Sequence, residues 1–324
     1  MIAARNEEDN LMEHIPLLME QNYPEFEVIV VNDSSWDDTQ EILKALQIQF
    51  PNMHLIHLDE EKQNMQGKKF AITLGIKAAK HELILLTDAD CRPTHKNWIR
   101  EMAASMSDSK SIVLGFSPYS KAKGWLNKVI RFDTLMIGLH YLGMAKAGRP
   151  YMGVGRNLMY KKELFFSVGG FKSHYSVQSG DDDLFINQVA NKRNTAVQFS
   201  PEAQTISEPK KTWGDWKKQK KRHFTTLPHY KASDRNLLAF SSMSYVLMMA
   251  GFVGSMVLKN GMFVVGGMLL SRYIIQLSIL HGSVKRLGMD RDVAWLSPFL
   301  EVQLLFANAL IYFSNLVRKQ QKWK

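Results

Sequence analysis

Short hydrophobic runs alternate with amphipathic stretches along the first hundred residues. Three of these runs are rich in aliphatic and β-branched side chains, as strands are: 27–31, 53–58 and 82–87. Strands that alternate with helical patterns are typical of a parallel sheet covered by helices. Residues 33–38 supply turn and N-cap side chains after the first run and predict a helix over 39–48. We therefore expect an α/β domain that binds ligands where strands end and helices begin.

The last quarter of the chain is much more apolar than the rest. Residues 239–258 contain no charged side chain, and this run is long enough to cross the hydrocarbon core of a bilayer. Two further apolar runs follow, one interrupted by Arg272 and one that carries Glu301. We expect membrane helices over about 239–258, 262–281 and 295–317. A buried helical hairpin in a soluble protein is the alternative, but three such runs leave too little polar surface to cover them.

Basic residues flank these apolar runs. They crowd before the first run and again over 285–291, which places both segments on the cytosolic side by the positive-inside rule. The first two runs then form a hairpin with a tight turn at 259–261. A third span would put the basic tail, 318–324, outside, so the third run either lies in the interface or breaks the rule. We expect a multi-pass protein of a bacterial inner membrane, with the α/β domain on the cytosolic side.

Length, charge and cysteine content add further constraints. A chain of 324 residues suits one sizeable α/β domain with an appendage. The formal net charge of +10 favours an anionic partner such as a phosphate-bearing molecule or an acidic lipid. Nucleic acid is disfavoured because the basic residues adjoin a predicted span and form no recognition module. The single cysteine, Cys91, excludes an intramolecular disulfide and fits a reducing cytosol.

Two carboxylates, Asp88 and Asp90, close the third hydrophobic run. Side chains at positions i and i+2 of a strand share one face, so both can reach one divalent cation and the pyrophosphate that it bridges. Such a cation neutralises a leaving diphosphate. An isolated Asp-x-Asp is more often a solvated turn, but the position after a buried strand and the other acidic motifs favour a metal site.

Four other motifs contain candidate binding or catalytic residues. Asp33 ends a hydrophobic run, where its carboxylate can accept a hydrogen bond from a nucleobase. Lys68 follows a glycine at a helix start, which favours a phosphate but departs from the Walker pattern. The segment 153–157 contains two glycines and lets a substrate approach the backbone. Finally, the three carboxylates at 181–183 precede an apolar helix, and helix capping and general-base catalysis remain equally good explanations.

In this order the motifs resemble those of family 2 glycosyltransferases, and more closely those of the membrane-bound branch, over about residues 2–230. The resemblance implies a GT-A fold, which is a Rossmann-like mixed sheet with helices on both faces. It also implies Mg²⁺ or Mn²⁺ as cofactor. The expected reaction is inverting transfer of a hexose from a nucleotide sugar, with a UDP-sugar as the expected donor. The expected acceptor is a lipid or a growing saccharide of the cell envelope.

The resemblance assigns roles to individual residues. It places the donor nucleotide on Ala4, Arg5, Glu7, Asp33, Lys68 and Asp88. It places the metal on Asp90 and Asp88, with Asp90 favoured as the direct ligand. It places the diphosphate and the acceptor on Gly155, Asn157, Gln219, Arg222 and His223. The general base is expected to be Asp182, with Asp181 as the second choice because the register of three consecutive aspartates is ambiguous.

Two departures from the family pattern qualify these expectations. His223 stands where the family's Gln-x-x-Arg-Trp motif has tryptophan, which puts processive polymerisation in doubt. The basic run around it also suits contact with anionic lipid, and Trp213 and Trp216 suit an interfacial helix. In addition, only Met1 and Ile2 precede the segment that opens the family fold. We therefore expect a short first strand and hypothesise that the chain is truncated or its start is assigned too late.

Three parts are expected along the chain: a catalytic domain over 1–208, a basic interfacial segment over 209–236 and membrane helices over 237–324. Two alternative functions remain. A nucleotidyltransferase would also be acidic and metal-dependent, but it would release pyrophosphate instead of a nucleoside diphosphate. A catalytically silent membrane scaffold would bind nucleotide without turning it over.

Overall fold

The computed structural model describes residues 1–59 and 67–317, so the basic tail, 318–324, whose side of the membrane the sequence left open, falls beyond the described residues. In chain order the strands are β1 (Ile2–Ala4), β2 (Val28–Asp33), β3 (Met53–Leu58), β4 (Leu83–Leu86), β5 (Cys91–Pro93), β6 (Ile112–Gly115), β7 (Leu158–Lys161), β8 (Thr195–Gln198) and β9 (Thr205–Ser207). The helices are α1 (Glu8–Met19), α2 (Thr39–Gln49), α3 (Lys68–Ala78), α4 (Trp98–Ala103), α5 (Trp125–Lys146), α6 (Lys162–Ser167), α7 (Asp183–Val189), α8 (Trp213–Phe224), α9 (Ala232–Val257), α10 (Met262–Arg286), α11 (Asp292–Trp295) and α12 (Ser297–Val317).

The central sheet is mixed. Strands β1, β2 and β3 pair in parallel, and β4, β7, β6 and β8 form a second group in which β7 is antiparallel to both of its neighbours. The two groups meet because the Met1 amino group donates to the Leu85 carbonyl at 2.9 Å and the Thr87 N–H donates to the Met1 carbonyl at 3.3 Å. This pattern is that of parallel pairing, so β1 and β4 run in the same direction.

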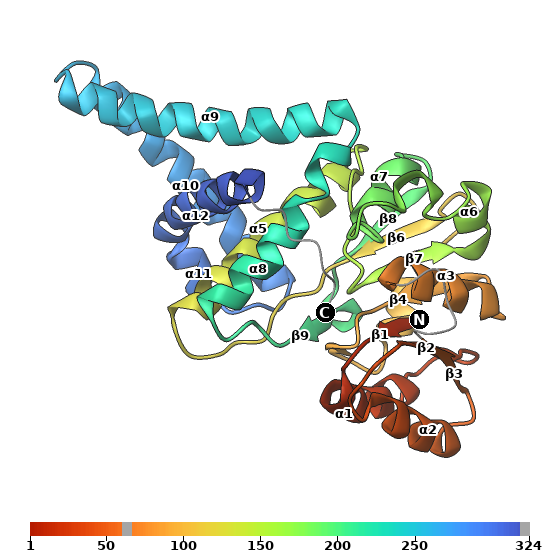
Figure 1. The fold of residues 1–324 in the computed structure, drawn as a ribbon. Helices are drawn as coiled ribbons and strands as arrows, with labels where there is room; N and C mark the ends of the chain where they lie inside the picture. The colour runs from red at the N-terminus through yellow and green to blue at the C-terminus, as the bar shows by residue number, and fades with distance from the viewer. Residues whose placement is uncertain (60–66, 318–324) are drawn as a thin grey trace.

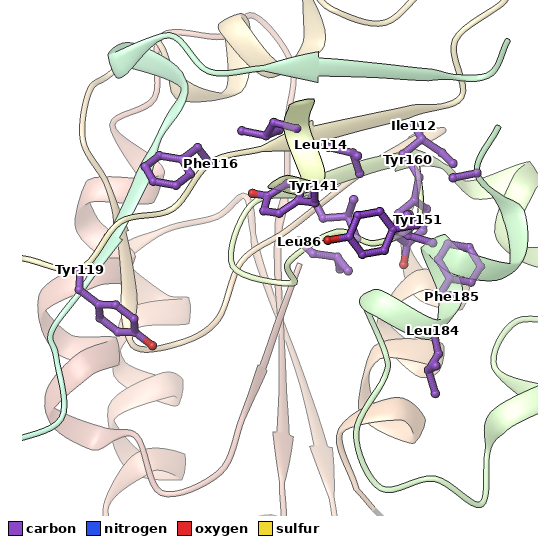
Figure 2. Close-up of a cluster of buried hydrophobic side chains, with 14 of the residues drawn as sticks. Leu86, Ile112, Leu114, Phe116, Tyr119, Tyr141, Tyr151, Tyr160, Leu184 and Phe185 are labelled. Carbon is purple, nitrogen blue, oxygen red and sulfur yellow. The ribbon is translucent and has the colours of Figure 1, made fainter. Parts of the chain in front are cut away.

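Both faces of the sheet are covered by helices, as expected for a GT-A fold. In β2, Val28 and Val30 pack in one apolar cluster with α1, α2 and α4, while Ile29 and Val31 pack in another with α3 and α5. Successive strand residues point to opposite faces, and a strand buried on both faces needs a continuous apolar run. Figure 1 shows this arrangement, and Figure 2 shows aromatic and aliphatic side chains of the second cluster.

Helices α9 and α10 form the hairpin predicted at the start of the apolar region. Lys259 and Gly261 take left-handed backbone angles, with φ of +49° and +70°, and these angles make the tight turn. The side chains along the hairpin are largely exposed, with Phe240 at 73% and Phe263 at 89%. Among the described residues, these two helices are long and apolar enough to cross a membrane. Helix α9 projects away from the α/β domain (Figure 1).

The third apolar run forms α12, which is hydrogen-bonded to α5 and α8 at two places along its length. Trp125 of α5 donates its indole N–H to Gln303 Oε1 at 2.7 Å, and Asn315 donates its amide N–H to the carbonyl of Lys221 in α8 at 2.7 Å. These contacts lie twelve residues apart, about 18 Å along a helix. Helix α12 therefore lies along α5 and α8, and we assign only α9 and α10 to the proposed membrane part.

The two charges that interrupt the apolar runs form an ion pair. Arg272 of α10 donates to Glu301 of α12, with Nη1 2.9 Å from Oε2. Its guanidinium also lies over the rings of Tyr245 and Tyr273, at 4.4 and 5.2 Å from their centroids. Charged residues in apolar helices are costly unless they are paired. The pair accounts for both charges and ties the hairpin to α12.

Helix α8, which bears the Gln-x-x-Arg-His motif, packs on α5. Lys220 Nζ lies 2.8 and 3.1 Å from the carboxylate oxygens of Asp133, and both side chains are buried. Trp216, one turn earlier, is only 3% exposed, whereas Trp213 is 45% exposed. The prediction of an interfacial helix with both tryptophans available to lipid is therefore wrong for Trp216, because its face of α8 packs on the protein.

We predict that Lys220→Met destabilises the protein by about 3–5 kcal/mol, because it leaves the Asp133 carboxylate buried without its partner. Lys218→Met is the matched control on the same helix. Lys218 pairs with Asp215 at the surface, so its loss should cost less than about 1 kcal/mol. Urea unfolding of the detergent-solubilised protein, followed by tryptophan fluorescence, measures both changes. Equal losses of unfolding free energy would contradict this account.

Candidate functional site

The predicted donor residues lie at one edge of the sheet. Ala4 ends β1, Asp33 ends β2 and Asp88 follows β4, and these strands run in the same direction. Arg5 and Glu7 continue from β1 into the same loop region. The loops after β1 and β2 are bonded to each other, since the Asn6 N–H donates to Ser35 Oγ at 2.9 Å. The carboxyl ends of parallel strands thus gather the motifs, as they do in open α/β sheets.

Asp33, the predicted nucleobase ligand, is 1% exposed. Burial, and then the charge of Asp33, raise the pKa of Tyr175, so the two side chains are close enough to interact electrostatically. The loop that carries Tyr175 is held by Lys69, whose Nζ donates to the carbonyls of His174 and Val177 at 2.6 and 2.7 Å. Sequence reasoning missed Lys69, which holds this loop beside Asp33.

Lys68 connects two of the acidic motifs. Its Nζ lies 2.8 Å from Asp88 Oδ1 and 2.9 Å from Asp181 Oδ2. Burial alone would lower the pKa of Lys68, but Asp181 and Asp88 outweigh it and raise that pKa well above its ordinary value. Burial likewise works to raise the pKa of Asp88, and the charge of Lys68 outweighs it, so the pKa is lowered. Both groups are therefore ionised, and the Asp-x-Asp motif lies next to the triple aspartate.

Asp88, Asp90 and Cys91 offer ligand atoms that all lie within 4.8 Å of one another. Carboxylate oxygens are the ligands that Mg²⁺ and similar hard cations prefer. The thiol differs, because Cys91 Sγ lies 2.8 Å from Ser207 Oγ, and burial followed by the charges of Asp90 and Asp88 raises its pKa well above the ordinary value. The cysteine therefore stays protonated, and the two carboxylates are the pair that fits a hard cation.

The three consecutive aspartates have different partners. Asp181 pairs with Lys68, and Asp182 Oδ2 accepts the Gly155 N–H at 2.6 Å. Asp183 accepts the hydroxyls of Thr226 at 2.5 Å and Tyr230 at 2.8 Å.

Asp182 has a pKa suited to proton transfer. Burial, and then the charges of Asp181 and Asp183, raise its pKa to about 7. A group with a pKa near the working pH is the most effective proton acceptor. Asp181, by contrast, is occupied by the Lys68 ammonium.

The predicted diphosphate and acceptor roles fit Gly155 and Asn157 poorly. The Gly155 N–H is bonded to Asp182, so this backbone amide supports the candidate base instead of facing a phosphate. Asn157 is 0% exposed, accepts the Trp98 indole N–H at 3.0 Å and donates to the carbonyls of Phe116 and Ala203 at 2.8 Å each. The Asn157 amide thus joins the backbone segments of Phe116 and Ala203, and we leave it out of the proposed ligand set.

The motif on α8 reaches the same region. Arg222 lies near the Asp-x-Asp motif, since its charge helps to lower the pKa of Asp88. Gln219 donates to the Tyr119 hydroxyl at 3.0 Å. Surrounding protein atoms, and then the charges of Arg222 and Lys220, lower the pKa of His223, although its side chain is exposed to solvent.

Sequence reasoning also missed Arg156 and Tyr119. The Arg156 guanidinium lies over the Tyr119 ring, 4.5 Å from its centroid, and its charge acts on Asp88. The glycine-rich segment that contains Arg156 was recognised, but not the role of this side chain. Tyr119 follows β6 in a stretch without any motif, so no sequence signal marked it.

Parts of the chain are similar in sequence to known glycosyltransferases. Glycosyltransferase AglE of Haloferax volcanii is 27% identical over 117 residues, which are 36% of this chain and 37% of AglE. A poly-β-1,6-N-acetyl-D-glucosamine synthase of Staphylococcus epidermidis is 32% identical over 90 residues, which are 28% of this chain and 21% of the synthase. The chain thus matches well under half of the length of these relatives.

One solved structure has the same fold over almost the whole chain. It is the mannosyltransferase PcManGT from Pyrobaculum calidifontis in complex with GDP-Man and Mn²⁺, with a TM-score of 0.61 and 16% sequence identity. The match covers 96% of this chain and 85% of that one. The sequence profile of glycosyl transferase family 2 matches residues 1–169, more than half of the chain and all of the strands up to β7. With a GT-A fold and this match, the chain belongs to glycosyl transferase family 2.

Proposed function

We propose that the chain is a metal-dependent, inverting glycosyltransferase that moves a hexose from a nucleoside-diphosphate sugar, with UDP-sugars as the first candidates, to a hydroxyl of a lipid or saccharide acceptor. The contact of Lys68 with both Asp88 and Asp181 carries the proposal. This contact brings the candidate metal motif and the candidate base motif into one cluster. A leaving diphosphate and an attacking hydroxyl must be close together in a single displacement.

The acceptor step is assigned to Asp182. Its carboxylate takes the proton of the acceptor hydroxyl while that oxygen forms a bond to the anomeric carbon of the sugar. The bond from this carbon to the diphosphate oxygen breaks, and the electron pair leaves with the nucleoside diphosphate. Attack from the face opposite to the leaving group inverts the anomeric configuration. The Gly155 N–H fixes one carboxylate oxygen, so the base is held in place before the acceptor binds.

Asp88 and Asp90 are the residues that would hold Mg²⁺ or Mn²⁺. A divalent cation bound there would act as a Lewis acid and offset the negative charge that develops on the diphosphate. Lys68 and Arg222 supply fixed positive charge beside the same carboxylates. Charge that is already in place when the bond breaks is a major source of rate enhancement.

We propose that the α9–α10 hairpin is embedded in a membrane and that the catalytic domain lies on its cytosolic face. The exposed apolar side chains of the hairpin and its two long apolar helices support this placement. Lys285 and Arg286 at the end of α10 put positive charge on the catalytic side. A lipid-linked or nascent saccharide acceptor would then be presented at this surface.

A panel of UDP- and GDP-sugars, incubated with the detergent-solubilised protein with and without Mn²⁺, tests the proposal. Release of a nucleoside diphosphate that depends on Mn²⁺ supports it. Release of pyrophosphate would instead indicate a nucleotidyltransferase, and nucleotide binding without turnover would indicate a silent scaffold.

Substitution of Asp90 tests the metal site. Asp90→Asn should raise the Mn²⁺ concentration needed for half-maximal activity by more than about tenfold, a loss that even changes next to metal ligands can cause. Cys91→Ser is the matched control in the same cluster and should leave this concentration almost unchanged, because the thiol is protonated. An equal loss in both variants would show that the sulfur is a ligand.

Asp182→Asn should reduce turnover by about 10²- to 10⁴-fold, the range typical of a lost general base, while donor affinity changes little. Asp181→Asn should behave differently and weaken donor binding, since it removes a partner of Lys68. Asp108→Asn, at an exposed position, is the control for the substitution itself. Turnover retained in the Asp182 variant would refute the assignment.

The pH profile supplies an independent check. Below a pH of about 7 the Asp182 carboxyl is protonated and cannot accept the acceptor proton, so kcat/KM should fall as the pH decreases through that value. Asp181, Asp183 and Lys68 are the charged groups that face Asp182. Asp183→Asn removes one negative charge and should move the acidic limb to lower pH. A limb that stays in place would contradict this electrostatic account.

A further inference from the structure

We infer that Arg156 binds the diphosphate of the donor and that Gln219 positions Arg156 through Tyr119. The inference rests on the proposed function, because it assigns a ligand to a residue of the same site. The chemical class of the ligand is a nucleoside diphosphate, recognised here by its phosphate oxygens. Gln219 was expected to contact the diphosphate or the acceptor itself, and its observed hydrogen bond gives it a different role.

The backbone around Arg156 is fixed on both sides. The Gly155 N–H is bonded to Asp182, and the Arg156 carbonyl accepts the Thr205 hydroxyl at 2.8 Å. Asn157 follows and is 0% exposed. The Arg156 side chain therefore extends from a rigid backbone segment, and this segment also supports the candidate base.

Tyr119 limits the directions that the guanidinium can take. The Arg156 Cζ atom lies 4.5 Å from the centre of the Tyr119 ring, and the ring is 9% exposed. Figure 2 shows Tyr119 set apart from the group of rings around Tyr160. Gln219 Nε2 donates to the Tyr119 hydroxyl at 3.0 Å and so fixes the ring. A guanidinium stacked on a ring keeps its N–H groups in the plane, where they match the geometry of a phosphate.

The guanidinium has an unused donor. Arg156 Nη1 is buried, and among residues 1–59 and 67–317 it has no hydrogen-bond partner. A buried donor on a charged group is costly without an acceptor. Asp88 and Asp90 are close enough for their charges to act on Arg156, yet neither forms an ion pair with it. A phosphate oxygen held beside those carboxylates would satisfy this donor through a charge-assisted hydrogen bond.

A purely local role for Arg156 is the competing explanation. In that case the guanidinium would only balance the charges of Asp88 and Asp90 and hold the fold, without touching a ligand. The two explanations differ in what a substitution changes. A phosphate contact affects ligands that carry phosphate, whereas a fold contact affects every ligand of the site.

Equilibrium binding to the full chain in detergent separates them. Calorimetry would measure the affinity for UDP and for uridine, and for GDP and guanosine, in the presence of Mn²⁺. Arg156→Gln should weaken diphosphate binding by about 10- to 100-fold, as expected for a lost hydrogen bond to a charged group, and leave nucleoside binding unchanged. The diphosphate affinity of Arg156→Lys should fall between those of the wild type and Arg156→Gln, since lysine keeps the charge but lacks the planar N–H donors of the guanidinium. Arg149→Gln, at an exposed position, is the matched control and should change neither affinity.

The role of Gln219 has its own signature. Gln219→Leu should weaken diphosphate binding less than Arg156→Gln does, again without an effect on the nucleoside. Because Gln219 is proposed to act through Arg156, the double variant should bind diphosphate no more weakly than Arg156→Gln alone. Additive losses would overturn the positioning role.

Three other outcomes are decisive. If the diphosphate and the nucleoside lose affinity equally in both Arg156 variants, or if neither variant changes diphosphate binding, the inference is wrong while the proposed function stands. If the wild-type protein binds neither nucleoside diphosphate, the proposed function and the inference both fail.

Discussion

The ion pairs of Lys68 are the interaction on which the site depends. Asp88, Asp181 and Asp182 lie close together in a poorly solvated place, and three carboxylates there cannot all stay ionised without a cation. Lys68 supplies that cation from the first turn of α3, where its ammonium contacts Asp88 and Asp181 and outweighs burial to lower the pKa of Asp88. The carboxyl that Lys68 contacts least directly, Asp182, is the one whose pKa rises to about 7. The same arrangement thus prepares an ionised metal motif and a proton acceptor beside it.

The sequence was informative wherever a pattern was local. The run predicted over 53–58 is β3, and the helix predicted from Thr39 is α2, because apolar periodicity and turn residues report directly on neighbours along the chain. The acidic motifs were found because each ends or follows such a run. The register of the triple aspartate was not predictable. Its partners Lys68, Thr226 and Tyr230 lie more than forty residues away, and no local pattern records a contact across that separation.

The apolar region shows the same limit. Arg272 and Glu301 each interrupted a predicted span and weakened that prediction when taken alone. They lie 29 residues apart and form a pair, so each explains the other. The third run is largely apolar, yet it packs on α5 and α8 instead of resembling α9 and α10, because Gln303 and Asn315 form hydrogen bonds to those helices. Hydropathy counts the polar residues in a run, but it does not report whether they have hydrogen-bond or ion-pair partners elsewhere in the fold.

Helix α8 connects the site with the apolar C-terminal region through residues that follow each other along the chain. Lys220 points to Asp133 of α5, the Lys221 carbonyl accepts from α12, and Gln219 and Arg222 point toward the site. A helix turns by about 100° per residue, so consecutive side chains serve different neighbours. The position of Arg222 is therefore set by the packing of α8 between α5 and α12. Helix α12 is also joined to α10 by the ion pair between Arg272 and Glu301. The hairpin proposed for the membrane and Arg222, which is proposed to face the diphosphate, are therefore both held by α12. The membrane-bound acceptor and the soluble donor that we propose would then meet at a site whose geometry does not depend on a flexible linker.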